Sequence, residues 1–465
     1  VAIAATSTLK VTIGDTNGKL VATAANLTMA AGSLIEPVIA GRITSGTAIT
    51  IAQSGAAITA STADVVENYS RYTFAVAQCN TNDLCLTPTL IAPAGVSGAG
   101  AAVSEVADAA FASDSTMNDA INSLTGESLN KALKTLAPAV DGGAIVGAVS
   151  AGAASSATIS TQMANLRSGV AAGQGLNAGD GTGEEQRAWA QGFGTYAEQE
   201  IRESIAGFTS NTGGMAFGVD KRFRDDLVLG VAYSFSHTNV DSSESKNETK
   251  VQSHQATLYG SHDFSLNGFS DLFVDGQLSY AHNGYDGERY IEVGAVSRRA
   301  DGDYDGMQIS SKFDLGKTFN EGAYRFTPTV GVSYAHVSID SYNETNAGAS
   351  NLRLQDQDYD MLSFNLKGKV ARTWQVNGDD VTPEVHLGYS HEVIHDKIST
   401  LSSFQGGGDA FTSTGFKPAN NTYLGGVGVT WGGDSLPVDL ALTYDATVKD
   451  HFIAHSGLFK GVWRF

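Results

Sequence analysis

Two histidines flank a glutamate in the segment His391-Glu392-Val393-Ile394-His395, which matches the signature of zinc metalloproteases letter for letter. That signature binds zinc only on a helix, where positions four apart face one metal ion. Here the segment continues an alternating run of apolar residues: Val381, Pro383, Val385, Leu387 and Tyr389. On a strand that rises about 3.3 Å per residue the two imidazoles would be about 13 Å apart, whereas zinc–nitrogen bonds measure about 2.1 Å. We therefore predict a solvated strand end rather than a metal site.

Two other segments are similar to sites of chemistry but do not complete them. Asp301-Gly302-Asp303-Tyr304-Asp305-Gly306 matches the first half of a calcium-binding loop, but Lys312 occupies the twelfth position, where a bidentate glutamate is needed. We predict an acidic, solvated loop, with a loosely held calcium ion as the alternative. Gly425-Gly426-Val427-Gly428 falls within a predicted strand and not at a strand-to-helix turn, so phosphate binding is not expected. Because the sequence also lacks a nucleophile elbow and a Ser/His/Asp set, we predict no enzymatic activity, metal ion or cofactor.

The two cysteines of the chain, Cys79 and Cys85, enclose the turn-forming residues Asn80-Thr81-Asn82-Asp83. Such a turn brings two strand ends together, which places the thiols within reach of each other. In an oxidising compartment we expect a local disulfide, and otherwise a pair of free thiols. Two cysteines in 465 residues exclude a disulfide scaffold, and their spacing matches no zinc site.

Composition narrows the class of protein. Charged residues make up 17% of the chain, and 53 glycines stand against 8 prolines, which is too apolar for a disordered chain and typical of a β-rich one. The net charge of −20 argues against nucleic acid as a partner, because nucleic-acid binding requires a basic surface. No run approaches the roughly 20 apolar residues of a membrane-spanning helix, which leaves membrane-spanning strands open. The chain starts at Val1 without a signal-peptide pattern, as expected for a processed or truncated product.

Three zones follow one another along the chain. Residues 1–102 contain short runs of Ala, Thr, Val and Ile separated by Gly and Asn turns, which predicts a β-solenoid or a small β-sandwich. Residues 103–186 show helical spacing instead, at Met117, Ile121, Leu124, Leu129, Leu133 and Leu136. After a stretch of small residues we predict a slim helix at about 155–168, followed by a Gly/Ala/Asp linker at 169–185.

From residue 187 to 465, apolar and polar residues alternate in runs of about 10 residues, the length of a tilted strand across a bilayer. About twelve such runs are joined alternately by short turns and long segments, as in an outer-membrane β-barrel. The long polar segments are 240–250, 285–302, 340–357 and 395–421. Aromatic residues form a row at the short turns, Phe223, Phe264, Phe319, Trp374 and Trp431, and a second row toward the long segments, Tyr233, Tyr280, Tyr334, Tyr389 and Tyr444.

The fold class that we predict is all-β, with a twelve-stranded antiparallel transmembrane β-barrel. A soluble β-sandwich is the alternative, but charged residues recur on the face opposite the apolar one. These residues would line the lumen: Asp275, Lys312, Asp314, Arg325, Lys367, Lys369 and Glu384. The closing strand carries Phe459, Gly461, Trp463 and Phe465 on its apolar face. It would pair with the strand at Trp189 and so remove the last open edge of the sheet.

A barrel of about twelve strands has room for one helix but not for a folded domain. The slim helix fits that bore, so we predict an α-helical linker in the lumen, with an ordinary surface helix as the alternative. Its polar residues would satisfy the polar lumen walls: Ser160, Thr161, Gln162, Asn165 and Arg167.

This region resembles the translocator end of monomeric autotransporters (type V secretion, type Va). The resemblance rests on four segments: Arg187-Ala188-Trp189-Ala190-Gln191-Gly192-Phe193-Gly194, Gly213-Gly214-Met215-Ala216-Phe217-Gly218-Val219-Asp220, Leu229-Gly230-Val231-Ala232-Tyr233-Ser234 and Val462-Trp463-Arg464-Phe465. It implies that a linker helix threads the barrel and that the insertion machinery recognises the terminal aromatic residue. Some members of the family cut themselves at an Asn-Asn pair in this helix; here only Asn165-Leu166 is present, so self-cleavage is not expected.

The resemblance implies an outer-membrane translocator that anchors and exports its own N-terminal passenger to the cell surface. Residues 1–102 would be the end of a β-helical, autochaperone-like passenger. The alternatives are a permanent display anchor of an adhesin or surface-layer protein, and a general porin. The expected partners are outer-membrane lipid and lipopolysaccharide, the barrel-assembly machinery and periplasmic chaperones. The sequence leaves open the activity of the full passenger (adhesin, surface layer or enzyme), its release, and the oligomeric state.

Overall fold

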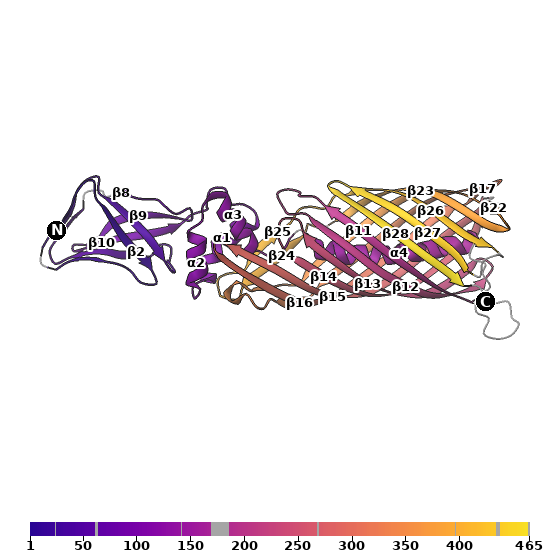
Figure 1. The fold of residues 1–465 in the computed structure, drawn as a ribbon, viewed down its shortest axis with the longest axis horizontal. Helices are drawn as coiled ribbons and strands as arrows, with labels where there is room; N and C mark the ends of the chain where they lie inside the picture. The colour runs from indigo at the N-terminus through magenta and orange to yellow at the C-terminus, as the bar shows by residue number, and fades with distance from the viewer. Residues whose placement is uncertain are drawn as a thin grey trace.

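The computed structural model describes residues 1–23, 25–60, 64–140, 142–168, 186–266, 269–395, 397–433 and 438–463. Figure 1 shows an elongated molecule in which a β-solenoid, a group of three helices and a long β-barrel follow one another along its axis. A fourth helix lies inside the barrel. The fold is mainly β, as the alternation and the composition predicted.

Residues 2–65 form a β-solenoid in which strands one coil apart pair in parallel. Its three faces consist of β1 (Ala2–Ile3), β4 (Leu27–Met29) and β7 (Ile58–Ala60); β2 (Thr8–Gly14), β5 (Leu34–Ala40) and β8 (Asp64–Val65); and β3 (Leu20–Ala22) and β6 (Ile49–Ser54). The register moves by one coil from Ala2 to Thr28 and by another from Thr28 to Thr59. Alternate side chains point into the coil, where Ile13 and Leu27 are fully buried. Of the two predicted alternatives, the structure therefore has the solenoid, because each coil buries its apolar face against the next.

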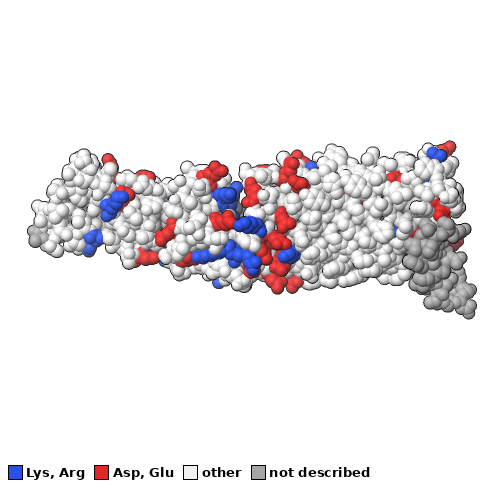
Figure 2. All heavy atoms as spheres, viewed as in Figure 1, with Lys and Arg blue, Asp and Glu red and all other residues white. Residues whose placement is uncertain are grey.

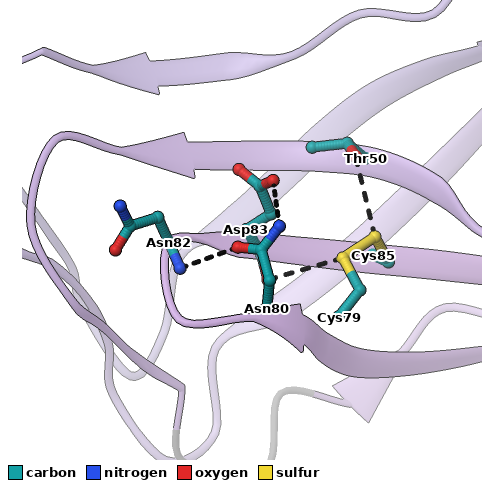
Figure 3. Close-up of a disulfide and its surroundings, with 6 residues drawn as sticks. All are labelled: Thr50, Cys79, Asn80, Asn82, Asp83 and Cys85. Atoms are coloured by element: carbon teal, nitrogen blue, oxygen red, sulfur yellow. Dashed lines mark hydrogen bonds between the residues drawn. A yellow bond between two sulfur atoms is a disulfide. The ribbon is translucent and has the colours of Figure 1, made fainter.

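An antiparallel hairpin, β9 (Tyr72–Asn80) and β10 (Asp83–Leu90), follows the solenoid, and β10 pairs with β6. Cys79 and Cys85 lie on the two arms of this hairpin and form a disulfide, with their Cα atoms 5.7 Å apart (Figure 3). The side chain of Asn80 holds the turn: its Oδ1 accepts a hydrogen bond from the backbone N–H of Asn82 at 2.8 Å, and its Nδ2 donates to Asp83 at 2.6 Å. The predicted turn residues thus bring the two sulfur atoms together.

Helices α1 (Ala99–Ala110), α2 (Ser115–Asn122) and α3 (Gly126–Leu136) form a compact unit between the solenoid and the barrel, which we call the cap. The cap buries apolar residues whose helical spacing predicted these helices: Met117, Ile121, Leu129, Leu133 and Leu136. Asp114 is the N-cap of α2, and its carboxylate accepts a hydrogen bond from the backbone N–H of Met117. Ile291, Val293 and Phe404, from the barrel side, pack into the same core. The cap and the barrel therefore share one hydrophobic core.

Twelve antiparallel strands close into the barrel. In chain order they are β11 (Gln186–Gln199), β12 (Phe208–Arg224), β13 (Leu227–Ser242), β14 (Glu248–Leu266), β15 (Phe269–Val293), β16 (Val296–Lys317), β18 (Tyr324–Ile339), β21 (Gln357–Arg372), β23 (Asp379–His395), β26 (Asn421–Gly433), β27 (Val438–Lys449) and β28 (Phe452–Trp463). Each strand pairs with the next, and β11 pairs with β28, with Gly192 opposite Phe459. Short strands β17 (Phe319–Glu321) and β22 (Trp374–Val376) prolong two hairpins at the short-turn end. The predicted fold class and closing pair are confirmed.

Two of the predicted long loops are wrong. In the polar segment 240–250, β13 continues to Ser242 and β14 starts at Glu248, so only residues 243–247 connect them. In the polar segment 285–302, β15 continues to Val293 and β16 starts at Val296, so the segment is a paired hairpin that projects beyond the apolar part of the barrel. The strands continue because backbone pairing needs no apolar side chains, whereas the sequence signal depended on them. A small sheet completes this end of the barrel, with β19 (Tyr342–Asn343), β20 (Leu352–Leu354), β24 (Ser399–Phe404), β25 (Phe411–Thr414) and the 3-10 helix η1 (Gly348–Ser350).

The outer face of the barrel is apolar over most of its height. Large exposed hydrophobic residues cover it: Met215, Phe217, Val231, Leu258, Leu278, Phe313, Val330, Leu366, Leu387, Leu442 and Phe459. Figure 2 shows this region as largely free of charged atoms, between a dense charged zone toward the cap and a few charged residues at the short-turn end. Tyr233 and Tyr280 of one aromatic row, and Trp374 and Trp431 of the other, are also exposed. Such a surface is stable in lipid, where only closed strands can satisfy every backbone group.

Candidate functional site

Helix α4 (Gly143–Ser168) runs lengthwise through the barrel lumen (Figure 1). It begins well before the predicted start near residue 155, because the preceding stretch of small residues is its N-terminal half. The prediction was wrong at this end since Gly and Ala give no apolar periodicity. Inside the lumen, small residues let the helix approach the wall: a Cβ atom on Gly147 would lie 3.3 Å from Cγ2 of Val240. Residues Gly143–Ala164 are long and apolar enough to cross a membrane, yet they are enclosed by strands.

Gln162 of α4 joins two oppositely charged groups of the barrel wall. Its Nε2 donates a hydrogen bond to Oδ2 of Asp220 at 2.9 Å, and its Oε1 accepts one from Nζ of Lys460. All three side chains are at most 4% exposed. Asp220 also accepts a hydrogen bond from the hydroxyl of Tyr259 at 3.0 Å, and that hydroxyl accepts one from Nε1 of Trp189 at 2.8 Å. The amide thus contributes one hydrogen bond each to a buried anion of β12 and a buried cation of β28, and such buried charges depend on hydrogen-bond partners.

A second polar contact lies at Ser160, on the β15–β16 side of the lumen. Its Oγ accepts hydrogen bonds from Nζ of Lys312 at 2.7 Å and from Nε2 of Gln277 at 2.8 Å. Ser156, one turn earlier on the helix, donates to Oε1 of the same glutamine at 2.8 Å. Nζ of Lys312 also lies 3.2 Å from the carboxylate of Asp314. Small hydroxyl side chains therefore connect the helix to charged wall residues without widening it.

The helix packs chiefly against β11–β15 and leaves cavities along the opposite wall. Two cavities of about 440 and 520 Å³ adjoin there, and both are lined by Lys369 and Glu384, whose charged atoms are 3.1 Å apart. His386 Nε2 lies 2.5 Å from Asp445, on the same side. The cavity of about 520 Å³ reaches residues of the short turns, such as Asn320, and we call it the lower cavity. This part of the lumen is polar enough to hold water.

The structure places the predicted lumen residues on the inner face. Asp275, Lys312, Asp314, Lys367, Lys369 and Glu384 line the cavity of about 440 Å³, and Arg325 lines the lower cavity of about 520 Å³. Of the predicted helix residues, Ser160 and Gln162 contact the wall, while Thr161 donates to the carbonyl of Ala157 in its own helix. The side chains of Asn165 and Arg167 lie outside the described residues, as do the side chain of Trp463 and the whole of Phe465. Asp220 and Lys460 were not singled out beforehand, although strand parity pointed to the lumen for both.

Two arginines of the β15–β16 hairpin fasten the cap to the barrel. Arg289 is 5% exposed and forms a bidentate ion pair with the carboxylate of Glu344, at 2.9 and 2.6 Å. Its Nη1 donates to the carbonyls of Thr135 and Leu136 at the end of α3, where a cation also favours the helix dipole. Arg298 donates to the carboxylate of Asp114 at 2.5 Å. The charged zone in Figure 2 therefore includes a structural joint.

A third arginine joins the solenoid to the cap. Arg71, 1% exposed, lies just before β9 and donates to Oδ1 of Asp108 at 2.9 Å, to Oδ1 of Asn122 at 3.1 Å and to the carbonyl of Ser104 at 2.8 Å. The hydroxyl of Tyr72 donates to the same aspartate. Such a guanidinium, with donors shared among several acceptors, fixes the two units in one orientation.

The segments that suggested metal chemistry lie in strands. The metalloprotease-like segment is the end of β23, where Glu392 accepts a hydrogen bond from Nζ of Lys449 at 2.6 Å. The side chain of His395 lies outside the described residues. Residues 301–306 belong to β16 and not to the predicted acidic loop. Within the described part of the chain, no three His, Cys, Asp or Glu side chains are grouped as a metal site would require.

A closed twelve-stranded barrel with an apolar outer face, an internal helix and an N-terminal domain at its long-loop end defines a protein-translocating barrel of the outer membrane. The family model of the autotransporter beta-domain matches residues 188–443, and the chain belongs to this family. It is therefore located in the bacterial outer membrane and is the translocator of the segment that precedes the barrel.

Curated relatives and a solved structure agree with this assignment. Outer membrane protein A of Rickettsia conorii is 27% identical over 290 residues, which cover 59% of this chain and 14% of that protein. Outer membrane protein B of Rickettsia japonica is 27% identical over 278 residues, 58% of this chain and 17% of that protein. The chain thus spans less than a fifth of these relatives. The translocator domain of the autotransporter NalP from Neisseria meningitidis has the same fold, with a TM-score of 0.50 and 16% identity over 69% of this chain and 99% of that domain.

We predict that the hydrogen bonds of Gln162 stabilise the barrel with its helix in place. Gln162→Ala removes the hydrogen bonds of the amide to Asp220 and Lys460, and we expect a loss of roughly 2 kcal/mol or more. The measurement is the temperature at which the detergent-solubilised barrel loses its compact mobility on gels. Thr161→Ala, the matched control, removes a hydroxyl bonded only to its own helix. An equal midpoint for the two variants would contradict the role of the bridge.

The Asp114–Arg298 contact predicts a pH dependence of cap docking. The hydrogen bond from Arg298 holds the pKa of the Asp114 carboxyl below its ordinary value of 3.8. The stabilisation is therefore fully present above that value and is lost as the pH falls below it, through the lowered pKa. Asp114→Asn keeps an N-cap acceptor but removes the charge. We expect faster amide hydrogen exchange in α2 of this variant at pH 7, and a difference from the wild type that shrinks on acidification. A difference that stays constant down to pH values well below 3.8 would refute the assignment.

Proposed function

We propose that this translocator ends its export cycle as a permanent display anchor, which holds the solenoid in a fixed orientation outside the cell. The observation that carries the proposal is the docking of the cap, which directly precedes α4 in the chain. Cap and barrel share a hydrophobic core, and Arg289 and Arg298 add partly buried polar contacts between them. Contacts of this kind stabilise a finished state in which the exported segment stays on its barrel.

The orientation of the chain follows from the lengths of its connections. Outer-membrane barrels have short turns on the periplasmic side and long ones outside. The solenoid and the cap lie at the end of the long β15–β16 hairpin, and the C-terminus lies at the short-turn end (Figure 1). The solenoid is therefore external in the proposal, and its hairpin disulfide encloses a loop of only five residues, from Asn80 to Leu84, which would not obstruct export.

Two other functions have less support. A general porin needs an open bore, whereas α4 occupies this lumen and the cap covers its outer end. We also propose that the described part of the chain acts in export and anchoring and not as an enzyme. The relatives named outer membrane proteins A and B are in line with a surface protein.

Partners follow from the surfaces of the barrel. We propose that outer-membrane lipid and lipopolysaccharide surround the apolar belt, and that periplasmic chaperones carry the unfolded chain. The barrel-assembly machinery would recognise the closing strand, on which Phe459 points outward and is 56% exposed. This strand is the last to be paired, and its unpaired edge before closure is a natural template for another strand.

Permanent display is tested by an epitope at Gly46, which is exposed in the solenoid. We expect antibody to bind intact cells, and little tagged protein to appear in the medium, because the docked cap holds the passenger. The matched control carries the epitope at Gly378, in a short turn, and should bind antibody only after lysis. Tagged fragments that accumulate in the medium would overturn permanent display, while failure of the Gly46 tag to label cells would overturn the orientation.

The role of the terminal aromatic residue is tested by deletion of Phe465. We expect a strong loss of inserted barrel, because recognition of the closing strand by the assembly machinery would be weakened. Phe465→Tyr keeps an aromatic ring and should insert nearly as the wild type does. Insertion is measured as heat-modifiable barrel in outer-membrane fractions. Normal amounts after the deletion would show that recognition does not depend on this residue.

A further inference from the structure

The lumen is divided into two compartments along α4. Near the start of the helix, a small cavity of about 80 Å³ is lined by Gly143, Arg289 and Glu344 and lies beneath the cap. The two large cavities begin farther along the helix, at Val149, and continue to the short turns. Among the described residues, none lines both the small cavity and a large one, whereas the two large cavities share several lining residues. The small cavity is therefore separated from the two large cavities by packed side chains.

An apolar cluster lies between the small cavity and the two large cavities, and we call it the collar. It consists of Ile145 and Ala148 of α4 and of Val251, Tyr285, Val337 and Tyr359 from the surrounding strands, all at most 6% exposed. The wall residues come from β14, β15, β18 and β21, which lie in one part of the sheet, and Ile339 and Ile398 belong to the same cluster. On the β13 side the helix needs no side chain, because Gly147 lies against Val240 and Thr238. The collar is therefore a buried apolar cluster that packs against one level of the helix.

Below the collar the lumen is apolar on one side, where Ile159 and Met163 pack on Trp189 and Phe193, and polar on the side of the large cavities. Ser160 and Gln162 hold α4 through hydrogen bonds to polar wall residues, and Lys369 and Glu384 line both large cavities. Polar cavities of several hundred Å³ hold water, and the lower one extends to the short turns. In contrast, an apolar constriction excludes ions because it offers no group to replace their hydration shells. The polar half of the helix fastens the plug but does not by itself close the bore.

We propose that the collar is the permeability barrier of this barrel, and that the lumen below it is a water-filled vestibule open to the periplasm. Ions and small polar solutes would enter as far as Val149 and stop at Ile145. This inference concerns the purified barrel and does not depend on display or retention of the passenger, so it can fail while the proposed function holds, and the reverse.

Two substitutions on the same helix face test the proposal. Ile145 and Ile159 are 6% and 2% exposed, respectively, and lie about 21 Å apart at 1.5 Å per residue. Ile145 belongs to the collar, whereas Ile159 packs on Trp189 and Phe193 beside the polar region. The full chain is reconstituted in planar lipid bilayers, and the single-channel conductance of Ile145→Asn and Ile159→Asn is compared with that of the wild type. We expect a low conductance for the wild type and Ile159→Asn, and a several-fold rise for Ile145→Asn.

The alternative results are equally clear. If the helix seals the bore along its whole length, opening one level leaves the others closed, neither variant raises the conductance, and the proposal is overturned; an equal rise for both variants overturns it as well. It is also overturned if Ile145→Asn leaves the conductance unchanged, if only Ile159→Asn raises it, or if the wild type already conducts strongly. Heat-modifiable mobility verifies that each variant is folded. Should Ile145→Asn fail to insert, Val337→Asn places the same polar group in the collar from the wall and replaces it in the comparison.

Discussion

The pairing of β11 with β28 is the interaction on which the rest of the structure depends. In a bilayer no water satisfies an unpaired strand edge, so the sheet must close on itself. Closure with twelve strands creates a bore, and in this barrel a helix occupies it. The closed wall then positions the polar groups that hold helix α4 and the rim on which the cap rests.

Helix α4 performs two tasks in the bore, at two different levels along its length. Fastening is polar: Gln162 bridges Asp220 and Lys460, and Ser160 accepts hydrogen bonds from the opposite side. Sealing is apolar, at the collar around Ile145. The separation has a physical reason, because polar groups that hold a helix firmly also attract water, whereas an apolar ring excludes ions but gives little directional hold.

Above the bore, arginine side chains connect the barrel to the cap and the cap to the solenoid. Arg289 and Arg298 join the barrel to the cap, and Arg71 joins the cap to the solenoid. Each guanidinium shares its donors among several acceptors, which fixes orientation better than a single-point contact does. The solenoid, the cap and the barrel are thus connected in series by these contacts, which supports the proposed display of the solenoid in a fixed orientation.

The sequence by itself determined the barrel, its lipid face, its lumen face and its closing strand, because period-2 alternation reports directly which side of a strand each residue occupies. It also predicted the disulfide through the turn residues between Cys79 and Cys85. Only the tertiary structure decided where α4 begins, that residues 285–302 form a paired hairpin, and which partner each lumen residue finds. Small residues and polar strand ends carry no periodic signal, and contacts such as that of Gln162 with Lys460 join residues 298 positions apart. Burial and pairing at that separation exist only once the sheet has closed.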